Sequence, residues 1–127
     1  MNELKAKDWP FEINYLGNKA SNELAKVLQL SDYFLHASNM ETFSIVIAEA
    51  LSTGTPVLAS RVGAISELVT EDCGILSENT IESWLDGLKK LESTNFNYQK
   101  ISLKTEKYSG KIIGERFQEL YKSILKT

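Results

Sequence analysis

The sequence is poor in cysteine, histidine and proline. Its 127 residues include one cysteine, Cys73, one histidine, His36, and two prolines. A single cysteine cannot form an internal disulfide, and no cluster of cysteine and histidine suggests a zinc site. We therefore expect no metal and no bound cofactor, and we interpret Cys73 as a small residue of a turn or of the core. A reducing, cytoplasmic setting fits this cysteine usage.

Excess positive charge and long apolar runs are absent as well. The 14 lysine and arginine residues are outnumbered by 17 acidic ones, which gives a net charge of −3. Nucleic-acid binders normally carry a basic stripe, so we predict no nucleic-acid partner. No apolar run approaches the roughly 18 residues that cross a bilayer. The charged N-terminal stretch MNELKAKDWP does not have the pattern of a secretory signal.

What the sequence does contain is an alternation of strand and helix signals, which predicts an α/β fold with a Rossmann-like parallel sheet flanked by helices. One core is the size that 127 residues can build, so we expect 1–127 to form a single domain. The expected strands are 11–16, 33–37, 56–60 and 74–76. One helix is expected to start at Ser21, with Glu23 and Leu24 in its first turn. Four more are expected at 44–53, 64–69, 80–91 and 111–125. Residues 93–110 are ambiguous.

Residue types at the helix ends refine this prediction. Ser21 and Ser44 are expected to cap the helices that follow them. Gly54 suits the left-handed position that closes a helix. Ligands of parallel α/β sheets bind at the carboxyl ends of the strands. The loops of interest are therefore 17–20, 38–43 and 61–64.

The segment from Met40 to Ser60, METFSIVIAEALSTGTPVLAS, carries the strongest chemical signal. Glu41 should lie where a strand turns into a helix, and the free amides of Ser44, Ile45 and Val46 should point into the cleft. Such amides attract phosphate, aided by the helix dipole. Glu49 is five residues beyond Ser44, which is about 7.5 Å along the helix axis at a rise of about 1.5 Å per residue. Its side chain leans back toward the helix N-terminus, where a carboxylate could accept two ribose hydroxyls.

The segment resembles the signature of the retaining family-4 glycosyltransferases of the GT-B fold. In that family two glutamates separated by seven residues are followed by Ala, one or two small residues, Gly, Thr or Val, Pro, Val and Val or Leu. A strand, a glycine turn and a short helix with a further glutamate come next. The matching residues, in order, are Glu41, Glu49, Ala50, Gly54, Pro56, Val57, Gly63 and Glu67. The similarity is close over 12–76 and looser beyond.

The resemblance implies the donor-nucleotide-binding, C-terminal half of a glycosyltransferase. Glu41 would be the catalytic residue that faces the donor sugar near its 3- and 4-hydroxyls. The backbone amides of Phe43, Ser44 and Ile45 would hold the diphosphate, and Glu49 would bind the ribose. The loop of Gly17, Asn18 and Lys19 would approach the base.

Further expectations follow from the same resemblance. The sugar would pass from a nucleotide-diphosphate donor to an acceptor with retention, in polysaccharide or glycolipid biosynthesis. The full enzyme would work in the cytoplasm, at the inner face of the membrane through peripheral association.

The chain departs from the family pattern in two respects. Thr42 and Ser44 stand where the family usually has glycine, which lets a backbone approach phosphate closely. The arginine and lysine that neutralise the diphosphate belong to a first β-α unit that we do not find in this chain. We therefore expect the domain to be incomplete at its N-terminus, to need an acceptor domain or a partner subunit, and to transfer no sugar by itself.

Several residues have plainer interpretations. His36 lies in an apolar strand, so we expect a packed, hydrogen-bonded core residue rather than a catalytic one. Arg61 is expected to be an exposed loop residue, and Trp84 to pack in the core or an interface. The apolar stripe of the last helix should be partly exposed, which favours self-association.

Two other functions remain open at this point. The chain could be a non-catalytic nucleotide-binding or scaffolding module with the same fold. It could also be a nucleotide-sugar epimerase of the same architecture, although that pattern fits the segment around Glu41 less well.

Overall fold

A computed structural model describes residues 10–125. Three parallel strands form one sheet in the order β1-β2-β3: β1 is Phe34–His36, β2 is Val57–Ser60 and β3 is Gly74–Ser77. β2 is the central strand, and Leu58 lies between Leu35 of β1 and Ile75 of β3. Each connection contains a helix, as parallel strands require. The Rossmann-like α/β architecture is thereby confirmed.

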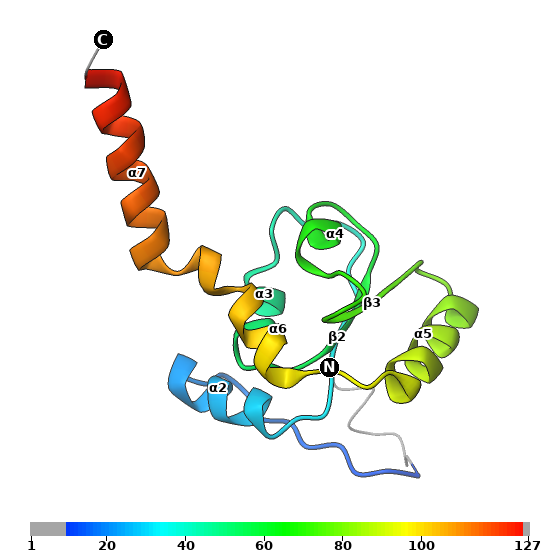
Figure 1. The fold of residues 1–127 in the computed structure, drawn as a ribbon. Coiled ribbons are helices and arrows are strands. Elements are labelled where there is room, and N and C mark those ends of the chain that lie inside the picture. The colour runs from blue at the N-terminus through cyan, green and yellow to red at the C-terminus, as the bar shows by residue number, and fades with distance from the viewer. Residues whose placement is uncertain (1–9, 126–127) are drawn as a thin grey trace.

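Helices lie on both faces of this sheet (Figure 1). The helix α3, Ile45–Ser52, packs on one face, and α5, Ile81–Ser93, packs on the opposite face against β2 and β3. The other elements are α2 (Ser21–Gln29), α4 (Ile65–Leu68), α6 (Tyr98–Lys104), the 3₁₀ turn η1 (Glu106–Tyr108) and α7 (Gly110–Leu125). The elements α6 and η1 resolve the region that the sequence left ambiguous.

The core is centred on β2, because this strand is covered on both faces. Every residue of β2 is buried, and Val57, Leu58 and Ala59 are completely inaccessible. Continuous apolar runs of this kind are typical of central parallel strands. From α3 the core receives Ile47, Ala50 and Leu51, and from the other helices Ile65, Leu91 and Ile101. Cys73 is buried as well, as expected.

The expected strand at 11–16 is wrong. Residues 11–20 are all exposed, and 12–16 form neither a strand nor a helix. Alternation produces a strand only where one face can be buried and a neighbouring strand can satisfy the backbone. In the described chain β2 is the only strand paired with β1, and no strand pairs with 11–16. The local pattern therefore lacks the tertiary partner that it needs.

Two expected helix caps also need correction. Ser21 is the first residue of α2, and the capping position is Ala20, whose backbone N–H donates to the Glu23 carboxylate at 3.1 Å. Ser44 does occupy the N-cap of α3, but its side chain caps no amide. Its backbone is left-handed, with φ 58°, whereas a capping serine is normally extended. Gly54 has φ +88° and closes α3 as expected.

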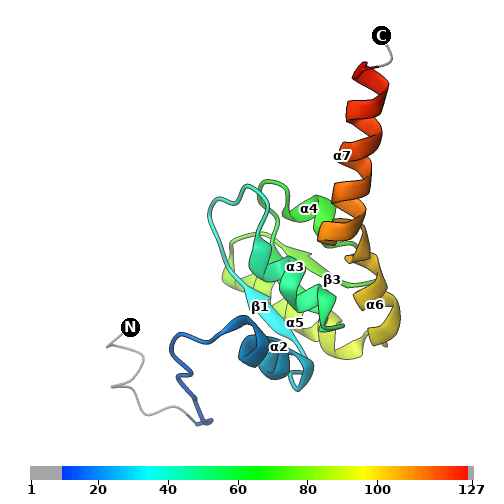
Figure 2. The same ribbon diagram turned by 90° about the vertical axis from the view of Figure 1, so that its left-hand side faces the viewer.

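The helix α7 projects away from the rest of the molecule (Figure 2). None of its residues is buried, and Phe117, Leu120, Tyr121 and Ile124 are each more than half exposed. The expected exposure of this apolar stripe is confirmed.

An ion pair fastens α6 to the turn before β3, and it gives the fold a predictable response to pH. Lys104 Nζ lies 2.5 Å from Asp72 Oδ1, and Thr70 donates a further hydrogen bond to the same carboxylate. The hydrogen bond from Lys104, followed by that from Thr70, lowers the pKa of Asp72 below its usual value of 3.8. The pair should therefore stabilise the fold fully above about pH 4 and lose its effect as the pH falls further.

We expect Asp72→Asn to reduce the free energy of unfolding at pH 7 by less than about 1 kcal/mol, because the carboxylate is largely exposed. The difference from wild type should shrink between pH 5 and pH 3, as measured by urea denaturation. Glu71→Gln is a suitable control, since it removes an exposed carboxylate from the residue next to Asp72. A difference for Asp72→Asn that is constant over this pH range would contradict the prediction.

Candidate functional site

The carboxyl ends of the three strands are joined by one hydrogen-bond network. Ser60, the last residue of β2, is completely buried, and its Oγ accepts from the Ser38 N–H at 3.0 Å. The same Oγ donates to Asn79 Oδ1 at 2.5 Å. The Asn79 amide then donates to the Ser38 carbonyl at 2.9 Å. This network fixes the position of the 38–41 loop, which leads to the candidate catalytic residue.

Glu41 lies beside the end of β1. Its Oε1 is 2.9 Å from Nε2 of His36, and the two side chains are 23% and 20% exposed. Oε2 has no protein partner among the described residues. A carboxylate that is held by one oxygen and open at the other can accept a hydrogen bond from a ligand.

The backbone of Glu41 is held from the other side by Gly63. This glycine has φ +51°, and a Cβ built on it would lie only 1.8 Å from the carbonyl oxygen of Glu41. No other residue type leaves enough room for this contact. Gly63 was expected to serve the turn itself, and the structure adds a direct role in placing the Glu41 loop.

The N-terminus of α3 opens next to this loop. Ser44 is buried, whereas Ile45 is 68% exposed. The first intrahelical amides with an acceptor are those of Ile47 and Ala48, which both donate to the Ser44 carbonyl. Helix geometry leaves the amides of Ile45 and Val46 without an intrahelical acceptor. Amides without an intrahelical acceptor can donate to an anion, and the predicted contact with a phosphate stays a prediction.

Glu49 lies one helical turn beyond Ile45, on the same side of α3. It is half-buried and lines a cavity of about 530 Å³ between α3 and the α6–η1 segment. Tyr108 lines the same cavity, and its ring makes an edge contact with Phe43 at 5.4 Å between centroids. Glu41 is not among the residues that line this cavity. The structure therefore places Glu41 shortly before α3 and Glu49 in the middle of that helix, in different surroundings.

The remaining expected donor residues lie outside these contacts. Gly17, Asn18 and Lys19 belong to the exposed segment ahead of α2. Gly17 has φ +63°, and a Cβ built there would meet open space. Their proposed contact with a base stays a prediction.

The expectation for His36 was wrong in one respect. It is hydrogen-bonded, as expected, but it is not a core residue, because it is the last residue of β1 and faces Glu41 at the edge of the sheet. Arg61 is exposed, as expected, and pairs with Glu78 at 3.1 Å. Ser60 and Asn79 were missed by the sequence reasoning. Asn79 follows the end of β3, so inspecting the loop after every strand would have included it.

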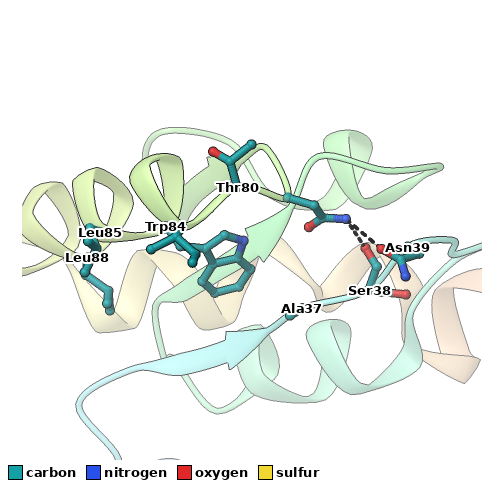
Figure 3. Close-up of a pocket in the computed structure, with 9 residues that line it drawn as sticks. Ala37, Ser38, Asn39, Thr80, Trp84, Leu85 and Leu88 are labelled. Carbon is teal, nitrogen blue, oxygen red and sulfur yellow. Dashed lines mark hydrogen bonds between the residues drawn. The ribbon is translucent and has the colours of Figure 1, made fainter.

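A second cavity opens on the opposite face of the sheet, between the end of β1 and α5 (Figure 3). Its volume is about 520 Å³. The indole of Trp84 projects from α5 into this space, toward Ala37, with Leu85 and Leu88 behind it. The end of the cavity opposite Leu85 and Leu88 is polar, because Asn79 donates there to Ser38 and Asn39. Trp84 thus packs partly against the core and partly borders an open surface.

Metal-binding and membrane-spanning features are missing from the described part of the chain. Within 10–125, no group of three or more histidine, cysteine or acidic residues could hold a metal ion. No helix in the same range is long and apolar enough to cross a membrane.

Comparison with known proteins identifies the family. Residues 2–109 match the family model described as glycosyl transferases group 1. The D-inositol 3-phosphate glycosyltransferase of Corynebacterium urealyticum is 30% identical over 120 residues, which is 88% of this chain and 28% of the relative. One subunit of the human phosphatidylinositol N-acetylglucosaminyltransferase is 36% identical over 78 residues, which is 61% of this chain and 16% of the relative.

A third relative, the N-acetyl-alpha-D-glucosaminyl L-malate synthase of Bacillus anthracis, is 37% identical over 65 residues, which is 50% of this chain and 16% of the relative. The chain spans less than a third of the length of each of these relatives. The match to the family model covers most of the chain, including both glutamates, α3 and the glycine turn at Gly63. The chain belongs to the group 1 glycosyltransferase family.

Proposed function

We propose that this chain forms the donor-binding part of a retaining glycosyltransferase of the GT-B fold. Its substrate would be a nucleotide-diphosphate sugar, and the acceptor would be a precursor of a polysaccharide or glycolipid. The observation that carries the proposal is the position of Glu41 at the carboxyl edge of a parallel sheet, beside the open N-terminus of α3, in a chain of this family.

Each part of a donor sugar nucleotide has a candidate partner. The amides at the start of α3 would hold the diphosphate through the orphan N–H groups and the helix dipole. Glu41 would face the sugar with its open oxygen, and Glu49 would accept the ribose hydroxyls. Gly17, Asn18 and Lys19 would approach the base. Oriented donors that stabilise a departing diphosphate are a large part of such catalysis.

The cations that the reaction needs would come from another segment or subunit. The stretch 40–60 contains two glutamates and no lysine or arginine. Two features could receive such a segment. In the described chain β1 pairs with β2 alone, and Leu35 of β1 is 51% exposed. The cavity beside Trp84 lies next to this open edge.

We infer that a partner strand and helix complete the donor site and that the acceptor lobe comes with them. The partner strand would pair with β1, and its helix would cover the Trp84 cavity. Sugar transfer in the cytoplasm, at the inner membrane face, is part of the same proposal.

The proposal is tested by ¹⁵N–¹H NMR titration of the chain with UDP, GDP and ADP in turn. We expect one nucleotide to shift the amides of 43–46 and Glu49 most strongly, because diphosphate and ribose contact these positions. Glu49→Gln keeps the size of the side chain and an acceptor oxygen but removes the charge. It should weaken binding of that nucleotide about five- to tenfold, as for the loss of a charged hydrogen bond.

Glu106→Gln is the matched control, because Glu106 lines the same cavity but lies on η1. It should leave the affinity within about twofold. Absence of shifts at millimolar nucleotide would contradict a preformed donor site. It would mean either that the inferred partner strand and helix are needed for binding, or that the chain is a scaffolding module with this fold.

A further inference from the structure

We propose that His36 is a positioning residue for Glu41, which orients the carboxylate toward the donor sugar. The inference rests on the proposed function of Glu41. It assigns a role to a side chain that the expected donor site did not include.

The position of His36 is fixed independently of Glu41. The residue ends β1, where its backbone is paired in register with Ala59 of β2. Its ring stacks on that of Phe34, with 6.2 Å between centroids and 15° between planes. The imidazole is therefore held by the sheet, whereas Glu41 lies on a loop. In this pair the histidine is the fixed partner, and the carboxylate is the group that gains an orientation.

The geometry also fixes which atom donates. The Glu41 carboxylate can only accept, so Nε2 of His36 carries the hydrogen in the 2.9 Å bond to Oε1. Ser44 Oγ lies 3.5 Å from the same nitrogen and is the weaker contact. Oε1 is thus occupied by the histidine while Oε2 stays open. A free glutamate on a loop would sample several staggered rotamers, and this bond selects one of them.

The test uses two conservative variants with opposite expectations. His36→Gln places an amide nitrogen near the position of Nε2 and can still donate to Glu41. His36→Asn places its amide near the position of Nδ1 and is too short to reach. A merely structural polar residue at the end of β1 would be replaced about equally well by either side chain.

The first measurement needs no ligand. Three-bond couplings of the Glu41 side chain should report one χ1 rotamer in wild type and His36→Gln, and averaged rotamers in His36→Asn. Averaged couplings in wild type, or unchanged couplings in His36→Asn, would overturn the inference whether or not a nucleotide binds. Should His36→Asn not fold, wild type still provides a test. A slowly exchanging imidazole N–H resonance should be present and should disappear in Glu41→Ala, and its absence from wild type would overturn the inference.

The second measurement compares the affinity for UDP-glucose, GDP-mannose or ADP-glucose with that for the matching nucleotide. His36→Asn should lower this ratio about fivefold while the nucleotide affinity stays unchanged. His36→Gln should restore the ratio. An equal ratio in all three proteins would overturn the inference. If wild type binds no nucleotide, the chain by itself has no preformed donor site, and the rotamer measurement alone decides the role of His36.

Discussion

Gly63→Ala is expected to displace the Glu41 loop and to lower the free energy of unfolding by about 2 to 3 kcal/mol. The alanine Cβ would lie 1.8 Å from the Glu41 carbonyl oxygen and 2.9 Å from its carbonyl carbon. Both atoms belong to the backbone, so no side-chain rotation can relieve the overlap. The backbone at φ +51° adds the cost of a left-handed conformation.

Displacement of this loop should break the hydrogen bond between His36 and Glu41. Urea denaturation measures the stability change, and amide shifts at Glu41 and His36 report the displacement.

Gly17→Ala distinguishes the two expected causes of the lost stability, which are the overlap with the Glu41 backbone and the left-handed conformation of the glycine. Gly17 also has a positive φ, +63°, but its added Cβ would meet no atom within 4 Å. We expect this variant to cost no more than about 1 kcal/mol and to leave the His36 and Glu41 resonances in place. Equal losses in the two variants would show that backbone conformation, rather than contact with Glu41, determines the glycine at 63.

Ser60→Ala is the second substitution with a large expected effect. It removes the acceptor of the Ser38 N–H and the donor to Asn79 in one step. Because Ser60 is completely buried, the unsatisfied partners should lower the free energy of unfolding by about 1 to 3 kcal/mol. The 38–41 loop should separate from the end of β3. Hydrogen exchange at the Ser38 amide should become faster, and denaturant unfolding measures the loss of stability.

The control for this variant is Ser77→Ala. Ser77 is also a buried serine at the end of a strand, 2% exposed, but its Oγ pairs with that of Ser83 at 2.9 Å. Loss of the Ser77 hydroxyl should lower the free energy of unfolding, while hydrogen exchange at the Ser38 amide stays close to wild type. If both variants accelerate exchange at Ser38 equally, the Ser60 network does not hold the loop, and general loss of stability explains the change.

The two substitutions act on one edge of the sheet through different groups. Gly63 leaves space for the backbone of the Glu41 loop, and Ser60 holds the start of that loop by hydrogen bonds. Gly63 has no side chain, and the Ser60 hydroxyl is completely buried and bonded to Ser38 and Asn79. If the proposed function holds, both variants should impair donor binding through the position of Glu41, although neither replaced side chain contacts the ligand.

Elements with local signals could be predicted from the residues alone. The apolar run at 56–60 predicted a buried strand, and β2 has no exposed residue. Gly54 predicted the end of α3, since a left-handed residue there needs no tertiary partner. The motif around Glu41 and Glu49 predicted the family, because its residue types and their spacing can be recognised without knowing the fold. Exposure of the α7 stripe also followed from the sequence.

Features that depend on residues distant in the chain could not be predicted in this way. The alternating residues at 11–16 form no strand, because pairing requires a neighbour that local pattern cannot supply. Ser44 is left-handed rather than a side-chain cap, and it turns toward His36 instead of the helix amides. The pairing of His36 with Glu41 joins the end of a strand to a loop five residues away.

The link between Ser60 and Asn79 joins residues 19 positions apart. Such contacts arise from sheet register, which brings together the ends of strands that the sequence separates. The family of this chain was therefore readable from its residues, and the packing of three strands decided which of its side chains lie together.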